Sequence, residues 1–352
     1  MNRSVGEETL SFDAFVLSVD KQFKKVRRSV DLENDSNAIF KTIFTSICGS
    51  DLRISKYGDS RIIEDRVLGH EIVAEVIYPG LRTDFIPGDI VAIGADIPCG
   101  LCVYCLRKRS NLCEVHTAVG YQFDGGFAEY VVFPNKFLKY APIVKVENSP
   151  KSFVYSLAEP AGCVINGLEF SRVEPTNSVA VIGAGPIGVM LAKLAMEYSS
   201  VPREQIALIE PISKRFDAVN KLGFKVFSNH EQVLKESLEF DRVFTATSNP
   251  DSHFSAIKLL RRGGVLNFFG GVPKELSKPI IDPNLLHYSE FTVGGSHGST
   301  PRQHEIAVGL ISKDIEFWEN LITSKFSLSE LPIAFESLRK GHDMKVGIYF
   351  GQ

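Results

Sequence analysis

Residues 179–198 read VAVIGAGPIGVMLAKLAMEY, and this stretch decides the fold of the central part of the chain. An apolar run of strand length leads into Gly183-x-Gly185-x-x-Gly188, and helical periodicity follows from Ile187 to Tyr198. In such a motif the first glycine permits a tight turn, the second lets the backbone approach a pyrophosphate, and the third lets helix and strand pack closely. A diphosphate then meets the amide groups and the positive end of the helix, at Pro186 and Ile187. The stretch predicts a dinucleotide site; a glycine turn required only for packing is the alternative.

The residue that selects the dinucleotide is expected about 20 residues after the motif. Glu210 stands there, at the end of the next apolar strand. A carboxylate at this position accepts hydrogen bonds from both adenosine-ribose hydroxyls and repels a 2′-phosphate, so it favours NAD over NADP. Lys214 and Arg215 follow closely and weaken that repulsion. The sequence predicts NAD as cofactor, with NADP less favoured.

The pattern around this stretch divides the chain into two domains. From residue 178 onward, strands at 179–182, 206–209, 225–227, 241–245, 265–268 and 291–294 alternate with helices at 187–198, 213–222 and 253–260. This alternation predicts an α/β domain with a doubly wound parallel sheet. The first ~150 residues instead show short strands at 38–45, 71–77, 89–94 and 127–133, separated by turn signals, which indicate an all-β, barrel-like unit. A helix at 332–340 and a strand at 346–350 are expected to return to that unit. The predicted domains are 1–157 with 297–352, and 158–296.

Composition excludes several classes of protein. The chain has 352 residues, 44% hydrophobic and 23% charged, and a net charge of -3, which is typical of a globular protein and argues against a general polyanion binder. We expect no nucleic-acid partner and no membrane span. The N-terminus has no apolar signal segment, so the expected location is the cytoplasm.

Four of the six cysteines lie in one short segment, Cys99-x2-Cys102-x2-Cys105-x7-Cys113. This spacing lets four thiolates surround one Zn²⁺ tetrahedrally, with no position left for a substrate, so it indicates a structural zinc site. Disulfides, or thiols that are merely close, are the alternatives. Cys48 and Cys163 stand apart from this segment.

Several motifs occur in the order seen in zinc-containing medium-chain dehydrogenases. The chain most resembles the polyol branch of that family, which includes sorbitol, threonine and sugar-phosphate dehydrogenases. The motifs are CGSD at 48–51, GHE at 69–71, PGD at 87–89, the four-cysteine segment, DGGFAEY at 124–130, AEPAGC at 158–163 and GAGPIG at 183–188. The resemblance covers nearly the whole chain. It implies a GroES-like β-barrel catalytic domain, a Rossmann domain, and a homodimer or homotetramer.

The resemblance also implies a catalytic zinc, which makes two zinc ions per chain. Cys48 and His70 would bind it, with Glu159 or Glu71 as the carboxylate ligand. Asp51 matches a carboxylate that orients the zinc-bound histidine, and Ser50 matches the hydroxyl that takes the substrate proton. Cys163 is interpreted as a small buried thiol. Zinc lowers the pKa of a bound alcohol, and hydride then passes to the nicotinamide.

Other positions are less clearly assigned. Many family members have a histidine in the proton relay where this chain has Arg53, which cannot act as a base; it binds a substrate anion or is a surface cation. Backbone contacts to the nicotinamide half are expected at the ends of two strands. The residues concerned are Phe269, Gly270 and Gly271, and Gly294, Gly295 and Ser296; His297, Arg302 and His304 follow and were considered as lining residues.

The predicted function is zinc-dependent oxidation of a secondary alcohol of a polyol, sugar, sugar phosphate, cyclitol or hydroxy-amino compound. A zinc-free quinone or enoyl reductase, which lacks the ligands Cys48, His70 and Glu159, is one alternative. A non-enzymatic NAD-binding protein is the second, and it is expected to have lost a zinc ligand or Ser50. A zinc-ribbon nucleic-acid protein is a third, disfavoured by the pI near 6.3.

Overall fold

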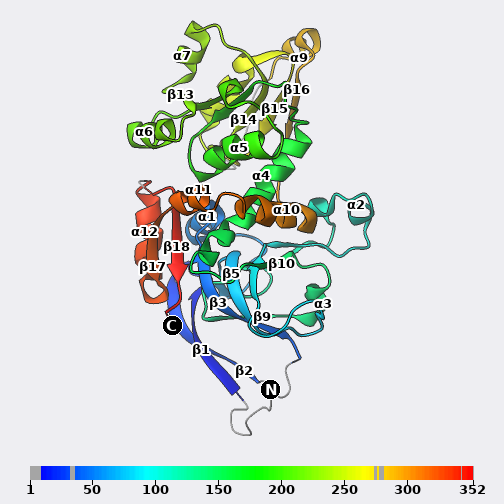
Figure 1. Cartoon of the computed structure of the whole chain (residues 1–352), viewed down its shortest axis with the longest axis vertical. Helices are drawn as coiled ribbons and strands as arrows, with labels where there is room; N and C mark the ends of the chain where they lie inside the picture. The colour runs from blue at the N-terminus through cyan, green and yellow to red at the C-terminus, as the bar shows by residue number, and fades with distance from the viewer. Residues whose placement is uncertain (1–8, 32–35, 273–275, 277–280, 342, 352) are drawn as a thin grey trace. The chain divides into compact units, whose positions relative to one another are not determined.

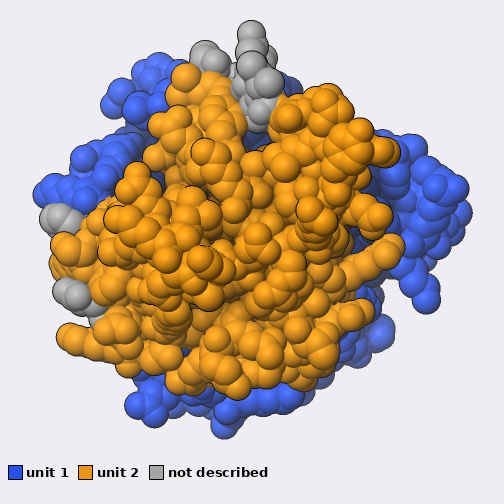
Figure 2. Space-filling view, turned by 90° about the horizontal axis from the view of Figure 1, so that it is seen from above, with its two compact units in different colours: residues 1–162, 299–352 blue, residues 163–298 orange. Residues whose placement is uncertain are grey.

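The computed structural model describes residues 9–31, 36–272, 276, 281–341 and 343–351. The chain forms two compact units, Met1–Gly162 with Ser299–Gln352, and Cys163–Gly298 (Figure 2). The sequence placed these divisions at 157/158 and 296/297. Helix α4 (Ala158–Phe170) contains the first division, so it belongs to both units.

Unit 2 contains a six-stranded sheet in the order β13-β12-β11-β14-β15-β16, and every pair in it is parallel (Figure 1). Its strands are β11 (Val179–Ile182), β12 (Ile206–Ile209), β13 (Lys225–Phe227), β14 (Phe240–Thr245), β15 (Leu260–Phe268) and β16 (Thr292–Gly295). Strand β11 is fully apolar and buried, because helices cover both faces of such a sheet. The chain runs outward in one direction through β12 and in the other through β14, so the carboxyl end of β11 is the topological switch point where ligands bind.

Three helices of unit 2 were predicted, one of them with wrong bounds, and the helices at 230–235 and 283–289 were not predicted. The helices are α5 (Pro186–Glu197), α6 (Ser213–Lys221), α7 (His230–Lys235), α8 (Pro250–Ser255) and α9 (Pro283–Ser289). The helix predicted at 253–260 begins earlier, because the Asn249 side chain caps it and Pro250 occupies its first turn. Leu260 already belongs to β15, so the predicted end was wrong.

Unit 1 is mainly β structure and contains the four strands predicted in the first 150 residues. Its larger sheet has the order β10-β6-β5-β3-β18-β17, with β9 also paired to β3, and its smaller sheets are β2-β1-β4 and β7-β8. The strands are β1 (Thr9–Leu17), β2 (Phe23–Asp31), β3 (Ala38–Ser46), β4 (Arg66–Val67), β5 (Glu71–Tyr78), β6 (Ile90–Ile93), β7 (Asp96–Ile97), β8 (Thr117–Ala118), β9 (Tyr130–Phe133), β10 (Ile143–Val146), β17 (Ile322–Ser327) and β18 (Lys345–Tyr349).

The C-terminal segment belongs to unit 1, because β18 pairs antiparallel with β3. Helix α12 (Leu331–Arg339) places Phe335 in the core beside Phe127 and Phe23. The other helices of unit 1 are α1 (Gly49–Tyr57), α2 (Val103–Leu106), α3 (Asn135–Leu138), α10 (Pro301–Ile311) and α11 (Ile315–Leu321). Among the described residues, no helix has both the length and the apolarity needed to cross a bilayer.

Candidate active site and metal centres

Cys48, His70 and Glu71 converge at one point in unit 1, where one ligand atom of each lies within 4.8 Å of the others. Strand pairing brings them together. The register of β3 on β5 places Ser46 opposite Glu71, so Cys48, just beyond the end of β3, lies next to the start of β5. A thiol, an imidazole and a carboxylate are ligand types of zinc, and the three side chains together fit such an ion.

The surrounding groups orient the imidazole for metal binding. Nδ1 of His70 lies 3.5 Å from Oδ1 of Asp51, and Nε2 lies 3.3 Å from Oγ of Ser50. Asp51 is fixed in turn, because its Oδ2 accepts a hydrogen bond of 2.9 Å from the amide of Cys48 at the start of α1. A carboxylate at Nδ1 leaves the Nε2 lone pair for a metal. Burial lowers the pKa of His70, but the charges of Asp51 and Tyr121 and hydrogen bonds with Asp51 and Cys48 together outweigh it, so the net shift is upward.

Glu71 has a partner that the sequence did not predict. Lys345 of β18 donates a 2.6 Å hydrogen bond to Oε1 of Glu71, and both side chains are buried, with exposures of 5% and 0%. The other oxygen, Oε2, is buried without a hydrogen-bond partner among the described residues. A buried carboxylate oxygen without a partner is costly, and a cation at this point would satisfy it.

Glu159 is also buried, in the first turn of α4. Burial raises its pKa to about 7; the charge of His70 lowers it, and that of Glu71 raises it. Its carboxylate is therefore near the centre, but it does not belong to the set of three that lies within 4.8 Å. The geometry places Glu71 closer to Cys48 and His70 than Glu159, and both stay candidates for the carboxylate ligand.

The four-cysteine segment forms a second cluster, and none of the six cysteines forms a disulfide. Sγ of Cys102 lies 3.5 Å from Sγ of Cys105 and 3.9 Å from that of Cys113. Backbone amides of Leu101 and Cys102 donate to Sγ of Cys99, each at 3.4 Å. Such bonds stabilise thiolates, and these two lower the pKa of Cys99. Backbone hydrogen bonds from Cys105 and Glu114 lower the pKa of Cys102 to about 6. The thiols fit a tetrahedral zinc ion.

The three glycines of the dinucleotide motif have different surroundings. Gly183 has φ +97°, and a Cβ there would lie 2.7 Å from the carbonyl oxygen of Ala246; at Gly188 a Cβ would lie 1.9 Å from the carbonyl oxygen of Gly183. Both glycines are thus required by the chain's own packing. At Gly185 a Cβ would meet nothing closer than Nη1 of Arg215, at 3.9 Å. The space at Gly185 is therefore open, as the approach of a pyrophosphate requires.

Glu210 lies at the end of β12, beside the glycine turn. Its Oε2 accepts a 2.9 Å hydrogen bond from the amide of Ala184, and its Oε1 accepts one of 2.9 Å from the amide of Ile212. Each oxygen keeps a further lone pair. Gly270 follows β15, and Ser296 follows β16 and bonds through its hydroxyl to Asn267. The carboxyl ends of neighbouring parallel strands thus carry all these residues.

Three other residues considered from the sequence have structural partners. Arg53 is half-exposed and pairs with Asp59 at 3.0 Å. His304 is buried, with Nε2 at 3.4 Å from the carbonyl oxygen of Ala92, as in a core histidine. The carbonyl of His297 accepts a hydrogen bond from Asn166.

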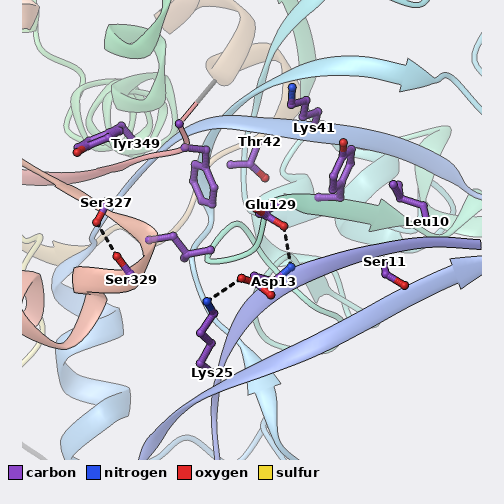
Figure 3. Close-up of a pocket in the computed structure, with 14 residues that line it drawn as sticks. Leu10, Ser11, Asp13, Lys25, Lys41, Thr42, Glu129, Ser327, Ser329 and Tyr349 are labelled. Atoms are coloured by element: carbon purple, nitrogen blue, oxygen red, sulfur yellow. Dashed lines mark hydrogen bonds and ion pairs between the residues drawn. The ribbon is translucent and has the colours of Figure 1, made fainter.

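Unit 1 also has a surface hollow of about 480 Å³, drawn in Figure 3. Lys25 pairs with Asp13 at 2.7 Å, and the Asp13 amide donates to Glu129. The hollow includes none of the predicted site residues.

Comparison with known proteins identifies the family of the chain. Residues 34–143 match the alcohol dehydrogenase GroES-like domain, and residues 157–350 match the glucose dehydrogenase C-terminus. The chain belongs to the zinc-type medium-chain alcohol dehydrogenase family. Family membership makes it an oxidoreductase that acts on CH–OH groups with zinc and a nicotinamide cofactor, and it does not support the zinc-free alternatives.

Two relatives and one solved structure illustrate the family. L-threonine 3-dehydrogenase of Caldanaerobacter subterraneus is 29% identical, over 96% of this chain and 99% of its own. D-altritol 5-dehydrogenase of Agrobacterium fabrum is 30% identical, over 84% and 86%. The structure of L-idonate 5-dehydrogenase from Escherichia coli superposes with a TM-score of 0.83 at 21% identity, covering 97% of this chain and 99% of the other. Two further solved neighbours hold NADP and NADH.

Proposed function

We propose that this dehydrogenase oxidises a secondary alcohol of a polyol or sugar derivative, with NAD as the hydride acceptor. The observation that carries the proposal is the convergence of Cys48, His70 and Glu71 beside Ser50. The sugar-alcohol and sugar-acid names of several relatives favour this substrate class.

The side chains have distinct roles in this proposal. Cys48, His70 and a carboxylate of Glu71 or Glu159 would hold the zinc, which would lower the pKa of the substrate hydroxyl. Ser50 lies 3.3 Å from Nε2 of His70 and accepts the proton of that hydroxyl. Asp51 keeps the imidazole in position. Arg53 stays charged and takes no part as a base.

Cofactor binding is assigned to unit 2. The turn formed by Gly185, Pro186 and Ile187 is proposed to face the diphosphate. Gly185 and Ile187 can donate their backbone N–H groups to it, whereas Pro186 has no N–H and contributes only its fixed φ. Glu210 selects the ribose and Arg215 flanks it. Gly270 and Ser296 are proposed to face the nicotinamide half through their backbones.

The test is a substrate screen on zinc-loaded protein. Pentitols, hexitols, aldonates, their phosphate esters and L-threonine are each supplied with NAD and with NADP, and reduced cofactor is recorded. We expect oxidation of at least one polyol-type substrate, with higher kcat/KM for NAD. Oxidation of primary alcohols alone would contradict the assignment. A homodimer or homotetramer in the cytoplasm, without nucleic-acid or membrane partners, is the proposed setting.

A further inference from the structure

Tyr121, which no motif singled out, adjoins the centre formed by Cys48, His70 and Glu71, and Arg61 stacks on Tyr121. The Tyr121 ring lies against the ring of His70, with centroids 5.7 Å apart. Tyr121 is 6% exposed, so it forms part of the wall around the imidazole. It lies on the segment between β8 and β9, and Arg61 lies on the loop after α1.

Arg61 stacks on the same Tyr121 ring. Its guanidinium carbon lies 3.9 Å from the centre of the Tyr121 ring, a cation–π distance. Asp59 holds the guanidinium by two bonds, Nε to Oδ1 at 2.9 Å and Nη2 to Oδ2 at 3.0 Å. The planar fork is therefore fixed in direction, while a third of the side chain stays exposed.

The charges of this group do not balance. Arg53 of α1 also binds Asp59, at 3.0 Å to Oδ2. Two guanidinium groups thus share one carboxylate, and among the described residues no second carboxylate forms an ion pair with either of them. Arginine forks suit carboxylate and phosphate groups, which they bind by paired hydrogen bonds.

We propose that Arg61, stacked on Tyr121, recognises an anionic group of the substrate, a phosphate or a carboxylate, at a distance from the reacting hydroxyl. This inference rests on the proposed function, and it narrows the substrate class from neutral polyols to polyol phosphates or aldonates. Tyr121 contacts both residues and links the Arg61 guanidinium to the side of the centre that His70 occupies. Arg53 and Arg61 both pair with Asp59, so the three side chains together carry a net positive charge.

The chain contains a matched control for this arrangement. Arg82 binds Asp84 with two bonds, Nε to Oδ1 at 2.7 Å and Nη2 to Oδ2 at 2.6 Å, and stacks on Phe85 at 4.5 Å. The pairing with a carboxylate and a ring is similar, although Nη1 of Arg82 also donates to the carbonyl oxygen of Leu138 at 3.2 Å. Phe85 packs in an apolar core cluster that contains no zinc-ligand candidate. R82Q therefore removes an equivalent arginine without touching the proposed substrate wall.

The first measurement is binding of inorganic phosphate by calorimetry, at constant ionic strength and with saturating NAD to occupy the diphosphate site. Wild-type protein, R61Q, R61K and R82Q are compared after their zinc content and melting temperatures are shown to match. We expect R61Q to weaken phosphate binding roughly tenfold or more. R61K should lie between wild type and R61Q, because it keeps the charge but not the fork, and R82Q should match wild type. Equal affinity in wild type, R61K and R61Q overturns the inference.

The second measurement uses a pentitol, its terminal phosphate ester and the corresponding aldonate as substrates. We expect the ratio of kcat/KM for an anionic substrate to that for the pentitol to exceed about tenfold and to collapse in R61Q but not in R82Q. Preference for the ester or for the aldonate identifies the anion. A ratio that is the same in wild type and R61Q, with the pentitol still oxidised, overturns the inference while the proposed function stands. Failure to oxidise any of the three, with phosphate binding still dependent on Arg61, overturns the proposed function instead.

Discussion

The two candidate zinc centres of unit 1 differ in how their ligands are supplied and in whether a coordination position stays open. The four-cysteine cluster comes from one segment of 15 residues, and its Cys99, Cys102 and Cys105 side chains are only partly buried. The other centre draws Cys48, His70 and Glu71 from two strand ends, buries His70 and Glu71, and is supported by Asp51 and Lys345. A closed set of four thiolates can only stabilise its loop, whereas three ligands leave a coordination position for chemistry.

The support around the centres differs as well. Backbone amides of the same segment stabilise the thiolates of the four-cysteine cluster. The other centre depends on side chains far away in sequence, since Lys345 is 274 residues from Glu71. The four-cysteine cluster is thus supported by residues of its own segment, whereas the other centre is supported by residues far apart in the sequence of unit 1. The following predictions test that difference, beginning with the largest effect.

Removal of a ligand from the open centre should abolish turnover. We expect C48A and H70A to lose activity by at least about a thousandfold, because the substrate hydroxyl is no longer activated. NAD binding, followed by fluorescence titration, should change little, because the residues assigned to it lie in unit 2. Turnover close to that of wild type in either variant would contradict the assignment of this centre.

The carboxylate ligand can be identified by zinc retention. We expect E159A to lower zinc occupancy at the open centre, because Glu159 occupies the position at which the alcohol-dehydrogenase branch of the family has a ligand cysteine. Glu71 is then expected to approach the metal only in some states. The measurement is elemental analysis of E159A and E71A after dialysis, with the four-cysteine zinc as an internal reference. Full retention in E159A with loss in E71A would show that Glu71 is the permanent ligand, which the 4.8 Å grouping favours. Retention of metal and activity in both variants would contradict the polyol-branch assignment.

Lys345 shows where sequence reasoning ends. The motifs predicted the two-domain fold and the cysteines, histidine and glycines, because each lies next to a local signal such as a strand end or a tight turn. Lys345 reaches Glu71 only through the pairing of β18 with β3, and Tyr121 meets His70 through a loop contact. Such contacts between distant segments have no local pattern. In the sequence, only the position of Lys345 at the start of the otherwise uncharged stretch KVGIY pointed to a buried ion pair.

A substitution at Glu210, in unit 2, should change cofactor preference and leave both metal centres intact. We expect E210A to narrow the kcat/KM preference for NAD over NADP by roughly tenfold, because repulsion of the 2′-phosphate is lost. Part of the effect will come from the glycine turn, since Glu210 also accepts the Ala184 amide. Zinc content should equal that of wild type. A native preference for NADP would show that Lys214 and Arg215 outweigh the carboxylate.

The smallest effect concerns acid stability of the unit that holds both centres. Burial lowers the pKa of His304 to about 4, below its ordinary value of 6.5. Below pH 6.5 the unfolded chain therefore binds a proton that the folded chain does not, and stability falls as pH drops from about 6.5 to 4. His304 accounts for at most about 3 kcal/mol of this loss. Melting temperatures over this range should fall less steeply in H304Q than in wild type; identical slopes would contradict the assignment.

The central claim is that one zinc ion is structural and enclosed while the other is catalytic and open. Its most direct test is a time course with a chelator, in which total zinc, activity and melting temperature are followed in the same sample. We predict two zinc ions per chain at the start, and rapid loss of one together with all activity. The second should leave slowly, with a fall in melting temperature, and C102S should lack it from the outset. Active protein with a single zinc, or simultaneous loss of both ions, would contradict the account.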